Sequence, residues 1–145
     1  MSTVRNVLSG KPARVHCISP SATVLDATWE MNRQKVGALL VTKQDRIIGI
    51  LTERDILQRV VAEQKSPGDV HVDEIMTTEV VCCQLDTPVE EASEIMRQRR
   101  VRHLPVCDSD GHVTGLISIG DLNAHYATEQ SVTIHYLNEY LYGRV

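Results

Sequence analysis

Two short segments of the chain pair a hydroxyl side chain with a carboxylate three residues later. Thr52 is followed by Asp55, and Ser118 is followed by Asp121. At a helix start this spacing forms a capping box, in which the hydroxyl and the carboxylate accept hydrogen bonds from each other's backbone amides. The same groups can bind a ribonucleotide, because a helix start holds a phosphate and a carboxylate accepts both ribose hydroxyls. The spacing alone favours the cap, since capping boxes are common.

Other reactive side chains show no pattern typical of catalysis or metal binding. The adjacent Cys82 and Cys83 point to opposite faces of a predicted strand, which argues against a shared metal. The six histidines lack the spacing of a zinc site. His103 is better suited to a cleft wall than to a catalytic base, and no nucleophile can be paired with an activating group. The sequence therefore predicts neither an enzyme nor a bound metal.

Composition limits the partners and the location of the protein. The chain has 145 residues and a formal charge of −4, with basic residues scattered among acidic ones, so nucleic acid is not an expected partner. The apolar stretches are far too short to span a membrane, and the first ten residues lack the features of a signal peptide. The four cysteines lack the spacing of a small secreted domain. We therefore expect a cytoplasmic protein without membrane insertion.

An internal repeat relates the two motifs to each other. Shifting the chain by 65 residues superposes the apolar positions of one half on those of the other, for example Val24 on Val89. A predicted hairpin turn is one residue longer in the second half, and beyond it the shift becomes 66, which places Asp55 on Asp121. A single insertion at a hairpin tip is readily tolerated. The chain therefore contains two copies of one structural unit.

Each copy is predicted to run strand, helix, strand, strand, helix. The strands are expected at residues 14–18, 38–41, 46–51, 80–83, 104–106 and 113–117. Apolar residues at i, i+3 and i+7 predict an amphipathic helix from Val24 and from Val89, and a second helix opens at Thr52 and at Ser118. One copy has too little apolar surface to be stable alone. We therefore expect an α+β fold of two units packed sheet against sheet, with pseudo-twofold symmetry and two related clefts.

The end of the chain repeats nothing else in the sequence. Ile134, Leu137 and Leu141 predict an amphipathic helix that begins at Ser131. It either packs on its own core or contributes to a dimer interface, and the sequence leaves both open. We divide the chain into a first unit, a second unit and a C-terminal helix, at residues 1–66, 67–127 and 128–145.

The segments that precede the two motifs are also duplicated. Residues 36–41 and 101–106, each followed by Gly-apolar-apolar-Thr/Ser-x-x-Asp, closely resemble the signature of the CBS domain, and the pair resembles a stand-alone Bateman module. The resemblance extends over about residues 4–125. It implies a flat pair of units whose clefts bind AMP, ATP or, in some members, NAD or S-adenosylmethionine. It also implies that the protein forms a homodimer.

The resemblance further implies which residues contact the nucleotide. The hydroxyl at the helix start contacts phosphate and the aspartate contacts ribose, which assigns these roles to Thr52 with Asp55 and to Ser118 with Asp121. The adenine lies against the strand after the first helix and the loop before that helix. In the first unit these positions are Ile18, Ser21, Thr23, Val36, Gly37 and Ala38. In the second unit the further positions are Cys83, Asp86, Thr87, Pro88, Val101, Arg102, His103, Leu104, Pro105 and Ile119.

Differences between the copies predict two unequal clefts. Leu40 stands where the second copy has Pro105 and where the family usually has proline. Arg54 and Arg102 each have a glycine as their counterpart. We therefore expect Arg54 to neutralise phosphate in one cleft and Arg102 in the other, by charge-assisted hydrogen bonds. The arginines within residues 97–100 end a predicted helix, where cations offset the helix dipole, so we expect them to form a solvated face.

Two classes of function remain open. In the first, the protein is a regulatory module that senses AMP and ATP or NAD, and binding shifts the orientation of the two units for an unidentified enzyme or transporter that responds in trans. In the second, it is a constitutive dimerisation or interaction scaffold whose clefts are vestigial. The presence of both Thr/Ser-x-x-Asp motifs favours the first.

Overall fold

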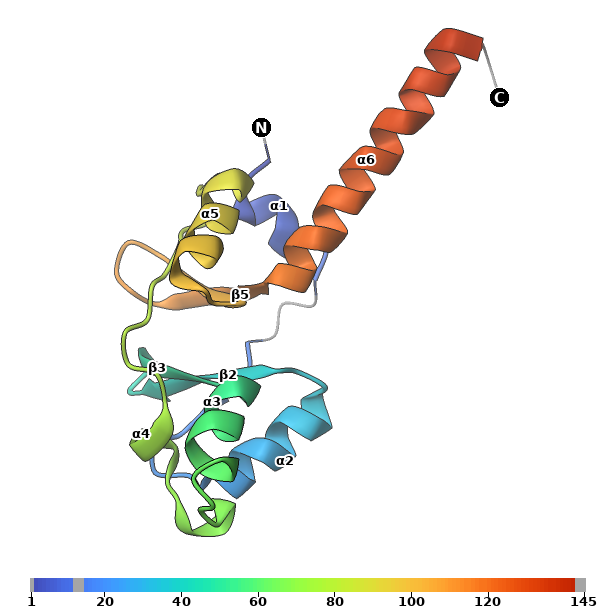
Figure 1. The fold of residues 1–145 in the computed structure, drawn as a ribbon. Coiled ribbons are helices and arrows are strands. Elements are labelled where there is room, and N and C mark those ends of the chain that lie inside the picture. Colours follow the sequence, from blue (N-terminus) through green and yellow to red (C-terminus); the bar gives the residue numbers. More distant parts are fainter. Residues whose placement is uncertain (1, 12–14, 143–145) are drawn as a thin grey trace.

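The computed structural model describes residues 2–11 and 15–142 and contains two units of similar order (Figure 1). The first unit consists of β1, α2, β2, β3, α3 and the π-helix η1, at Cys17–Ile18, Val24–Gln34, Ala38–Lys43, Arg46–Thr52, Glu53–Ile56 and Leu57–Val61. The second unit consists of α5, β4, β5 and α6, at Val89–Arg99, His103–Cys107, Val113–Ser118 and Ile119–Tyr142. Three short helices, α1, the 3-10 helix η2 and α4, lie at Val4–Ser9, Pro67–Asp69 and Val72–Ile75. The α+β fold and the duplication are confirmed.

The two hairpins have the same geometry. β2 and β3 pair antiparallel with Ala38 opposite Thr52, and β4 and β5 pair with His103 opposite Ser118. Each hairpin contains a register shift at an equivalent position, which follows Val41 in the first unit. The repeat in the sequence is therefore also a repeat of backbone geometry, and it carries each polar motif to the end of a hairpin.

The strand before each amphipathic helix is shorter than predicted. In the first unit β1 pairs parallel with β2, and residues 12–14 lie outside the described residues. In the second unit the strand predicted at 80–83 is wrong, because only Cys83 forms a bridge, parallel to Val106. Val80 instead packs against the core between the units, and Val81 packs on the core of the second unit. Burial of these β-branched residues, and not strand pairing, explains their apolar character.

Amphipathic spacing accounts for α2 and α5. Val24, Ala27 and Met31 are buried along one face of α2, and their counterparts in α5 are buried as well. Thr23 begins α2 because its hydroxyl accepts a hydrogen bond from the Asp26 amide at 3.1 Å. Each helix thus presents one apolar face to the hairpin of its own unit.

Each short lead-in helix packs on the unit other than the one that it precedes. α1 precedes the first unit, but Val4 and Val7 are buried in the core of the second. α4 follows the first unit, and Val72 and Ile75 are buried in the core of that unit. The predicted boundary between residues 66 and 67 therefore assigns α1 to the first unit and α4 to the second, although each helix packs in the core of the other unit.

Two glycines allow these lead-in segments to approach the hairpins. A Cβ at Gly49 in β3 would lie 2.6 Å from the sulfur of Met76 and 3.0 Å from the carbonyl oxygen of Thr77. A Cβ at Gly115, its counterpart in β5, would lie 2.8 Å from Cδ1 of Leu8. The same close approach is therefore built into both units.

The hairpins of the two units face each other across a shared core. Ala38, Leu40 and Ile50 are buried there, and Val113 and Leu116 of the second unit pack against them. Figure 1 shows β2 and β3 on one side of this junction and β5 on the other. The units thus pack sheet against sheet, as the sequence predicts, and their loops and helix starts meet at the edge of the junction.

α6 is one continuous helix, so the prediction that Ser131 begins a separate C-terminal helix is wrong. After Gly120 the segment up to residue 142 contains neither glycine nor proline, and the helix that opens after Ser118 has no reason to stop. Figure 1 shows α6 leaving the second unit and extending away from the first. Among the described residues, no helix is both long and apolar enough to cross a membrane.

Candidate functional site

A cavity of about 200 Å³ lies at the junction of the two units. The first unit contributes the ends of its strands and the start of α3, and the second contributes the connection from α5 to β4. The cavity is lined by Gly37, Ile50, Thr52, Glu53, Arg54, Asp55, Arg100, Val101, Arg102 and His103. Residues that the sequence assigns to two different clefts therefore lie together in one cavity.

A capping box holds the start of α3 in this cavity. The Thr52 amide donates to the Asp55 carboxylate at 3.0 Å, and the Asp55 amide donates to the Thr52 hydroxyl at 3.4 Å. The Glu53 amide donates to the carbonyl of Gly37 at 3.1 Å, which ties the helix start to the residue before β2. The capping interpretation of this motif is confirmed, so any ligand must bind to a helix start that is already capped.

The Asp55 carboxylate is almost fully enclosed, since the residue is 6% exposed. One of its oxygens accepts from the amide and the hydroxyl of Thr52. The other accepts from the hydroxyl of Thr77 at 3.1 Å, and the Arg59 guanidinium lies 3.9 Å from it. Each carboxylate oxygen can accept two hydrogen bonds. The oxygen beside Thr77 therefore keeps one acceptor position for a further donor.

Three guanidinium groups belong to the same cavity. Arg54, Arg100 and Arg102 all line it, and Arg54 donates to the carbonyl of Arg100 at 3.3 Å. The prediction that Arg54 and Arg102 serve separate clefts is wrong, because the connection from α5 to β4 lies next to the start of α3. Arg100 is exposed, as expected of a solvated face, and it also lines this cavity. With two carboxylates among its walls, the cavity carries a net positive charge, which suits an anionic ligand.

His103 forms a half-buried wall of the cavity. Burial lowers the pKa of His103 below its ordinary value, although the carboxylates of Glu53 and Asp121 act in the opposite direction. The cations Lys11 and Arg102 lower the pKa further. His103 is therefore neutral at physiological pH, so its ring offers one hydrogen-bond donor and one acceptor.

A second cavity, of about 220 Å³, adjoins the first. Ile50, Val101 and His103 line both cavities. The other lining residues are Thr77, Glu79, Val80, Val81, Arg99 and Pro105. The two cavities therefore form one groove, whose first part contains three arginines and whose second part contains one.

The second copy of the motif is also capped, but it lies outside these cavities. The Ser118 amide donates to the Asp121 carboxylate at 2.8 Å, and the Asp121 amide donates to the Ser118 hydroxyl at 3.1 Å. The Lys11 ammonium donates to the same carboxylate at 2.7 Å and to the carbonyl of Leu116 at 2.9 Å. Burial alone would raise the pKa of Asp121, but the hydrogen bonds from Lys11 and Ser118 outweigh it and lower the pKa.

Many of the other predicted contact residues are used by the fold. Thr23 caps α2, Asp86 forms an ion pair with Arg5 at 3.2 Å, and Ala38 and Leu104 are buried. Neither cavity is lined by Ile18, Ser21, Thr23, Val36, Ala38, Cys83, Asp86, Thr87, Pro88, Leu104, Ser118, Ile119 or Asp121. Contacts of these residues with a nucleotide stay predictions.

Several cavity residues are absent from the sequence prediction. Glu53 follows Thr52 directly and Ile50 precedes it by two residues, so both belong to the local sequence around the motif. Arg100 offers no such signal, because it ends α5 with a left-handed backbone and reaches the cavity only through the packing of the units. The same holds for Thr77, which follows α4.

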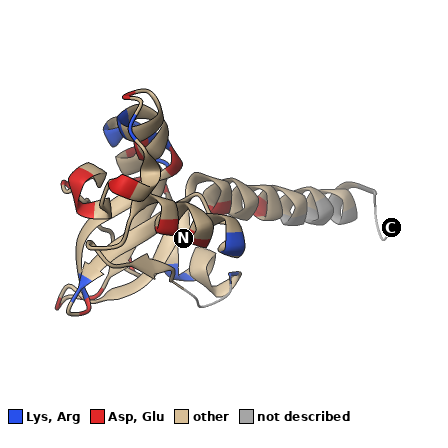
Figure 2. Cartoon of the chain, turned by 90° about the horizontal axis from the view of Figure 1, so that it is seen from below, with Lys and Arg blue, Asp and Glu red and all other residues tan. Residues whose placement is uncertain are grey.

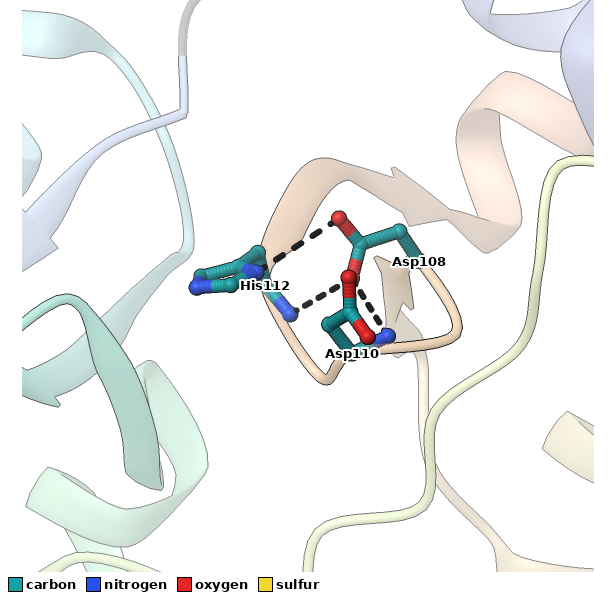
Figure 3. Close-up of side chains that lie close together, drawn as sticks. All are labelled: Asp108, Asp110 and His112. Carbon is teal, nitrogen blue, oxygen red and sulfur yellow. Dashed lines mark hydrogen bonds and ion pairs between the residues drawn. The ribbon is translucent and has the colours of Figure 1, made fainter.

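A separate group of polar side chains lies at the tip of the β4–β5 hairpin (Figure 3). Asp108, Asp110 and His112 are exposed, and one ligand atom of each lies within 4.8 Å of the others. The Asp108 carboxylate accepts from the amides of Asp110 and His112, both at 2.9 Å. Gly111 supplies the positive φ of 85° that this turn needs. Formation of the turn accounts for the cluster.

The chain matches the CBS domain family twice, at residues 4–62 and 72–127. It therefore belongs to the CBS domain family and contains a pair of these domains. The CBS domain-containing protein YhcV of Bacillus subtilis is 33% identical over 131 residues, with 90% of each chain covered. The CBS domain-containing protein CBSX3 of Arabidopsis thaliana is 36% identical over 126 residues, which are 83% of this chain and 61% of that protein. The chain thus spans about three fifths of some curated relatives.

Solved structures share the arrangement of the two units. A putative signal-transduction protein with CBS domains from Burkholderia ambifaria is 38% identical, with a TM-score of 0.85, and 89% of this chain and 96% of that chain are covered. The CBS domain protein PAE2072 from Pyrobaculum aerophilum, solved as a complex with AMP, is 27% identical, with a TM-score of 0.74 and coverage of 83% and 89%. The resemblance to a pair of CBS domains is confirmed.

Proposed function

We propose that this chain is a regulatory module that binds an adenine nucleotide in the cavity between its units. The observation that carries the proposal is the cavity itself, because three arginines and a capped helix start gather where both units supply walls. A ligand held by both units stabilises one relative orientation of them, which a partner protein can recognise. The AMP complex of a CBS protein of similar fold supports this ligand class.

The chemistry of the groove suggests how the nucleotide lies in it. Arg54 and Arg102 bind the phosphate together with the Thr52 hydroxyl, by charge-assisted hydrogen bonds. The free acceptor position of Asp55 accepts a ribose hydroxyl. The base occupies the second cavity, where Val80, Val101 and Pro105 supply apolar contacts. AMP, ATP and NAD share these groups, so each is a candidate ligand.

Calorimetric titration with AMP, ATP and NAD tests the proposal. Arg54→Gln and Arg102→Gln should each weaken nucleotide binding about tenfold, the loss expected for about 1.4 kcal/mol. The matched control is Arg97→Gln, because Arg97 pairs with Glu94 on an exposed face of α5 and lines neither cavity. It should bind as the wild type does. Equal affinities for all three variants and the wild type would show that the nucleotide binds elsewhere.

The alternative function is a constitutive interaction scaffold with vestigial clefts. One observation favours it: both motif carboxylates already accept hydrogen bonds from the protein itself, Asp55 from Thr77 and Asp121 from Lys11. Thermal unfolding with millimolar nucleotide separates the two functions, because only a ligand that binds the folded state raises the melting temperature. An unchanged melting temperature with all three nucleotides would favour the scaffold.

The proposed role is regulatory and not catalytic. Burial raises the pKa of the Cys83 and Cys107 thiols to about 12, so both are protonated at physiological pH and are poor nucleophiles. We propose that the response comes from a separate enzyme or transporter that binds in trans. The free thiols of Cys17 and Cys82 suit a reducing compartment such as the cytoplasm.

A further inference from the structure

Three of the four cysteines lie where the connection between the units meets β4. Cys83 forms a parallel bridge to Val106. The Cys83 amide donates to the carbonyl of Pro105, and the Cys83 carbonyl accepts from the amide of Cys107, both at 2.9 Å. These two hydrogen bonds hold the segment around Cys83 beside the end of β4. Cys82 and Cys107 therefore lie on neighbouring stretches of backbone.

Cys82 and Cys107 lie on the face that Cys83 points away from. Adjacent residues of an extended segment point to opposite faces, and directly paired residues point to the same face. Cys83 and its partner Val106 are both buried in the core of the second unit. Cys82 is exposed, and Cys107 is buried outside that core. The two thiols that share a face are therefore those of Cys82 and Cys107.

The Cys82 and Cys107 thiols also interact with each other. Both residues line a cavity of about 410 Å³. Burial, a hydrogen bond with Cys82 and the negative charge of a Cys82 thiolate together raise the pKa of the Cys107 thiol to about 12. A hydrogen bond between two thiol groups requires neighbouring sulfur atoms. The backbone pairing, the burial and the shared cavity thus agree that the two sulfur atoms lie next to each other.

A small molecule can reach the Cys82 thiol but not the Cys107 thiol. Cys82 is exposed, whereas Cys107 is 8% exposed. Of the residues that line the cavity, only Asp108 is charged. In the part of the chain that the structure describes, basic segments lie among acidic ones on both units (Figure 2), so no continuous acidic surface repels an anionic reagent. A small anionic disulfide can therefore approach the sulfur atom of Cys82.

We propose that Cys82 and Cys107 form a redox-responsive pair, which a low-molecular-weight disulfide such as glutathione disulfide oxidises to an intramolecular disulfide. The Cys82 thiolate attacks one sulfur of glutathione disulfide, forms a mixed disulfide and releases one glutathione. The Cys107 thiolate then attacks Sγ of Cys82, and the second glutathione leaves with the electron pair of the broken bond. The two protein thiols lose two protons and two electrons, which convert one glutathione disulfide into two glutathione molecules. The proposal does not depend on nucleotide binding.

The surroundings of the two thiols determine the order of these steps. Cys82 reacts first because it is exposed. Burial keeps the pKa of Cys107 high, but the mixed disulfide removes the negative charge of Cys82, which raises this pKa further. Cys107 therefore ionises more readily once Cys82 has reacted, next to the sulfur atom that it attacks.

The disulfide ties the connection between the units to the second hairpin. Val80 packs against the core between the units, and Val81 packs on the core of the second unit. Both residues come just before Cys82 in the chain, and both line the second cavity. Oxidation therefore fixes the segment that joins the units and that forms one wall of this cavity.

Glutathione redox buffers test the pair on the purified full chain without nucleotide. After the remaining thiols are blocked and the chain is digested, mass spectrometry should find a bond between Cys82 and Cys107. In concentrated urea the same bond should form about tenfold less, because only a flexible loop then connects the two positions. A folded chain without this bond, or with a bond between Cys82 and Cys83, would overturn the proposal. Equal formation of the bond in urea would also overturn it, since the fold would then not bring the thiols together.

Three alanine variants assign the two steps. Cys107→Ala should stop at the mixed disulfide, so that glutathione stays on Cys82. Cys82→Ala should leave Cys107 unmodified, because the oxidant does not reach a buried thiol. The matched control is Cys17→Ala, which removes the other exposed thiol and should form the bond as the wild type does. Thermal unfolding shows that each variant is folded. Glutathione on Cys107 of Cys82→Ala would show that the buried thiol reacts directly and would overturn the assigned order.

Discussion

The two units contain the same capped motif but give its carboxylate different partners. In the first unit Asp55 is enclosed, and the oxygen that does not contact Thr52 accepts from the neutral hydroxyl of Thr77. In the second unit Asp121 lies nearer the surface and accepts from the ammonium of Lys11. Both partners come from segments that follow a lead-in helix, α4 for Thr77 and α1 for Lys11.

This difference shows which part of a duplicated unit decides its chemistry. The cap is the same in both units, because hydroxyl and carboxylate are three residues apart in each. The Thr77 hydroxyl leaves Asp55 one acceptor position, and the nearest cation, Arg59, stays 3.9 Å away, whereas the Lys11 ammonium donates directly to Asp121 at 2.7 Å. The lead-in segment therefore determines whether the carboxylate can serve a ligand. The two units therefore differ because of Thr77 and Lys11. We expected unequal clefts from the difference between Leu40 and Pro105 in the sequence, and that difference did not identify Thr77 or Lys11.

The largest expected effect comes from removing the two carboxylates in turn. Asp55→Ala should lower the free energy of unfolding by about 3 kcal/mol, because the Thr52 amide and the Thr77 hydroxyl lose their acceptor in an enclosed site. Asp121→Ala should lower it by about 1 kcal/mol, since water can reach its partners. Urea unfolding measures both values. Asp86→Ala, at an exposed ion pair, is the control and should change little. An equal loss of stability for Asp55→Ala and Asp121→Ala would contradict the difference between the two units.

The second largest effect on stability is expected at Gly49 and Gly115, where the lead-in segments approach the hairpins closely. Gly49→Ala should cost about 2 kcal/mol, because its Cβ would meet the carbonyl of Thr77, which is fixed by a hydrogen bond from Ile50. Gly115→Ala should cost less than about 1 kcal/mol, because its Cβ would meet only the flexible end of Leu8. Thermal unfolding should separate the variants by several degrees. A larger loss for Gly115→Ala would show that the second unit is the more tightly packed one.

The sequence predicts those parts of the fold that depend on the spacing of apolar and polar residues over a few positions. The helices from Val24 and Val89 follow from apolar residues one turn apart, and the hairpins follow from alternating β-branched runs around polar turns. The caps at Thr52 and Ser118 follow from a spacing of three. In each case the residues that determine the element lie within a few positions of one another.

Long-range packing accounts for what the sequence did not predict. The exchange of α1 and α4 between the units depends on contacts such as Leu8 with Gly115, across about a hundred residues of chain. The cavity gains Arg100 because the units face each other, and no periodicity encodes that. The apolar run at 80–83 has the composition of a strand, but its side chains are divided between two cores. The apolar type of a residue indicates that it is buried, but it does not indicate which core it packs against.

The role of the lead-in cation can be tested by acid unfolding of Lys11→Met. The pKa of Asp121 is lowered in the folded protein, so its contribution to stability is present above the ordinary pKa and is lost as pH falls through the lowered value. Without Lys11, burial raises that pKa and the loss begins at higher pH. We expect a loss of about 1 kcal/mol at neutral pH and an acid midpoint at higher pH. Lys43→Met, at an exposed lysine in β2, should leave the midpoint unchanged. An unchanged midpoint for Lys11→Met would mean that Asp121 does not depend on this cation.

The smallest expected effect comes from His103, whose counterpart in the first unit is the buried Ala38. Burial lowers the pKa of His103 in the folded protein, so the unfolded chain binds a proton more readily as pH falls below about 6.5. The free energy of unfolding should therefore decrease on mild acidification, and His103→Ala, which copies the first unit, should reduce that decrease. Urea unfolding at neutral and at mildly acidic pH measures the difference, and NMR titration of the His103 ring gives its pKa directly. A ring that titrates at or above the ordinary value would mean that the carboxylates of Glu53 and Asp121 outweigh burial in this cavity.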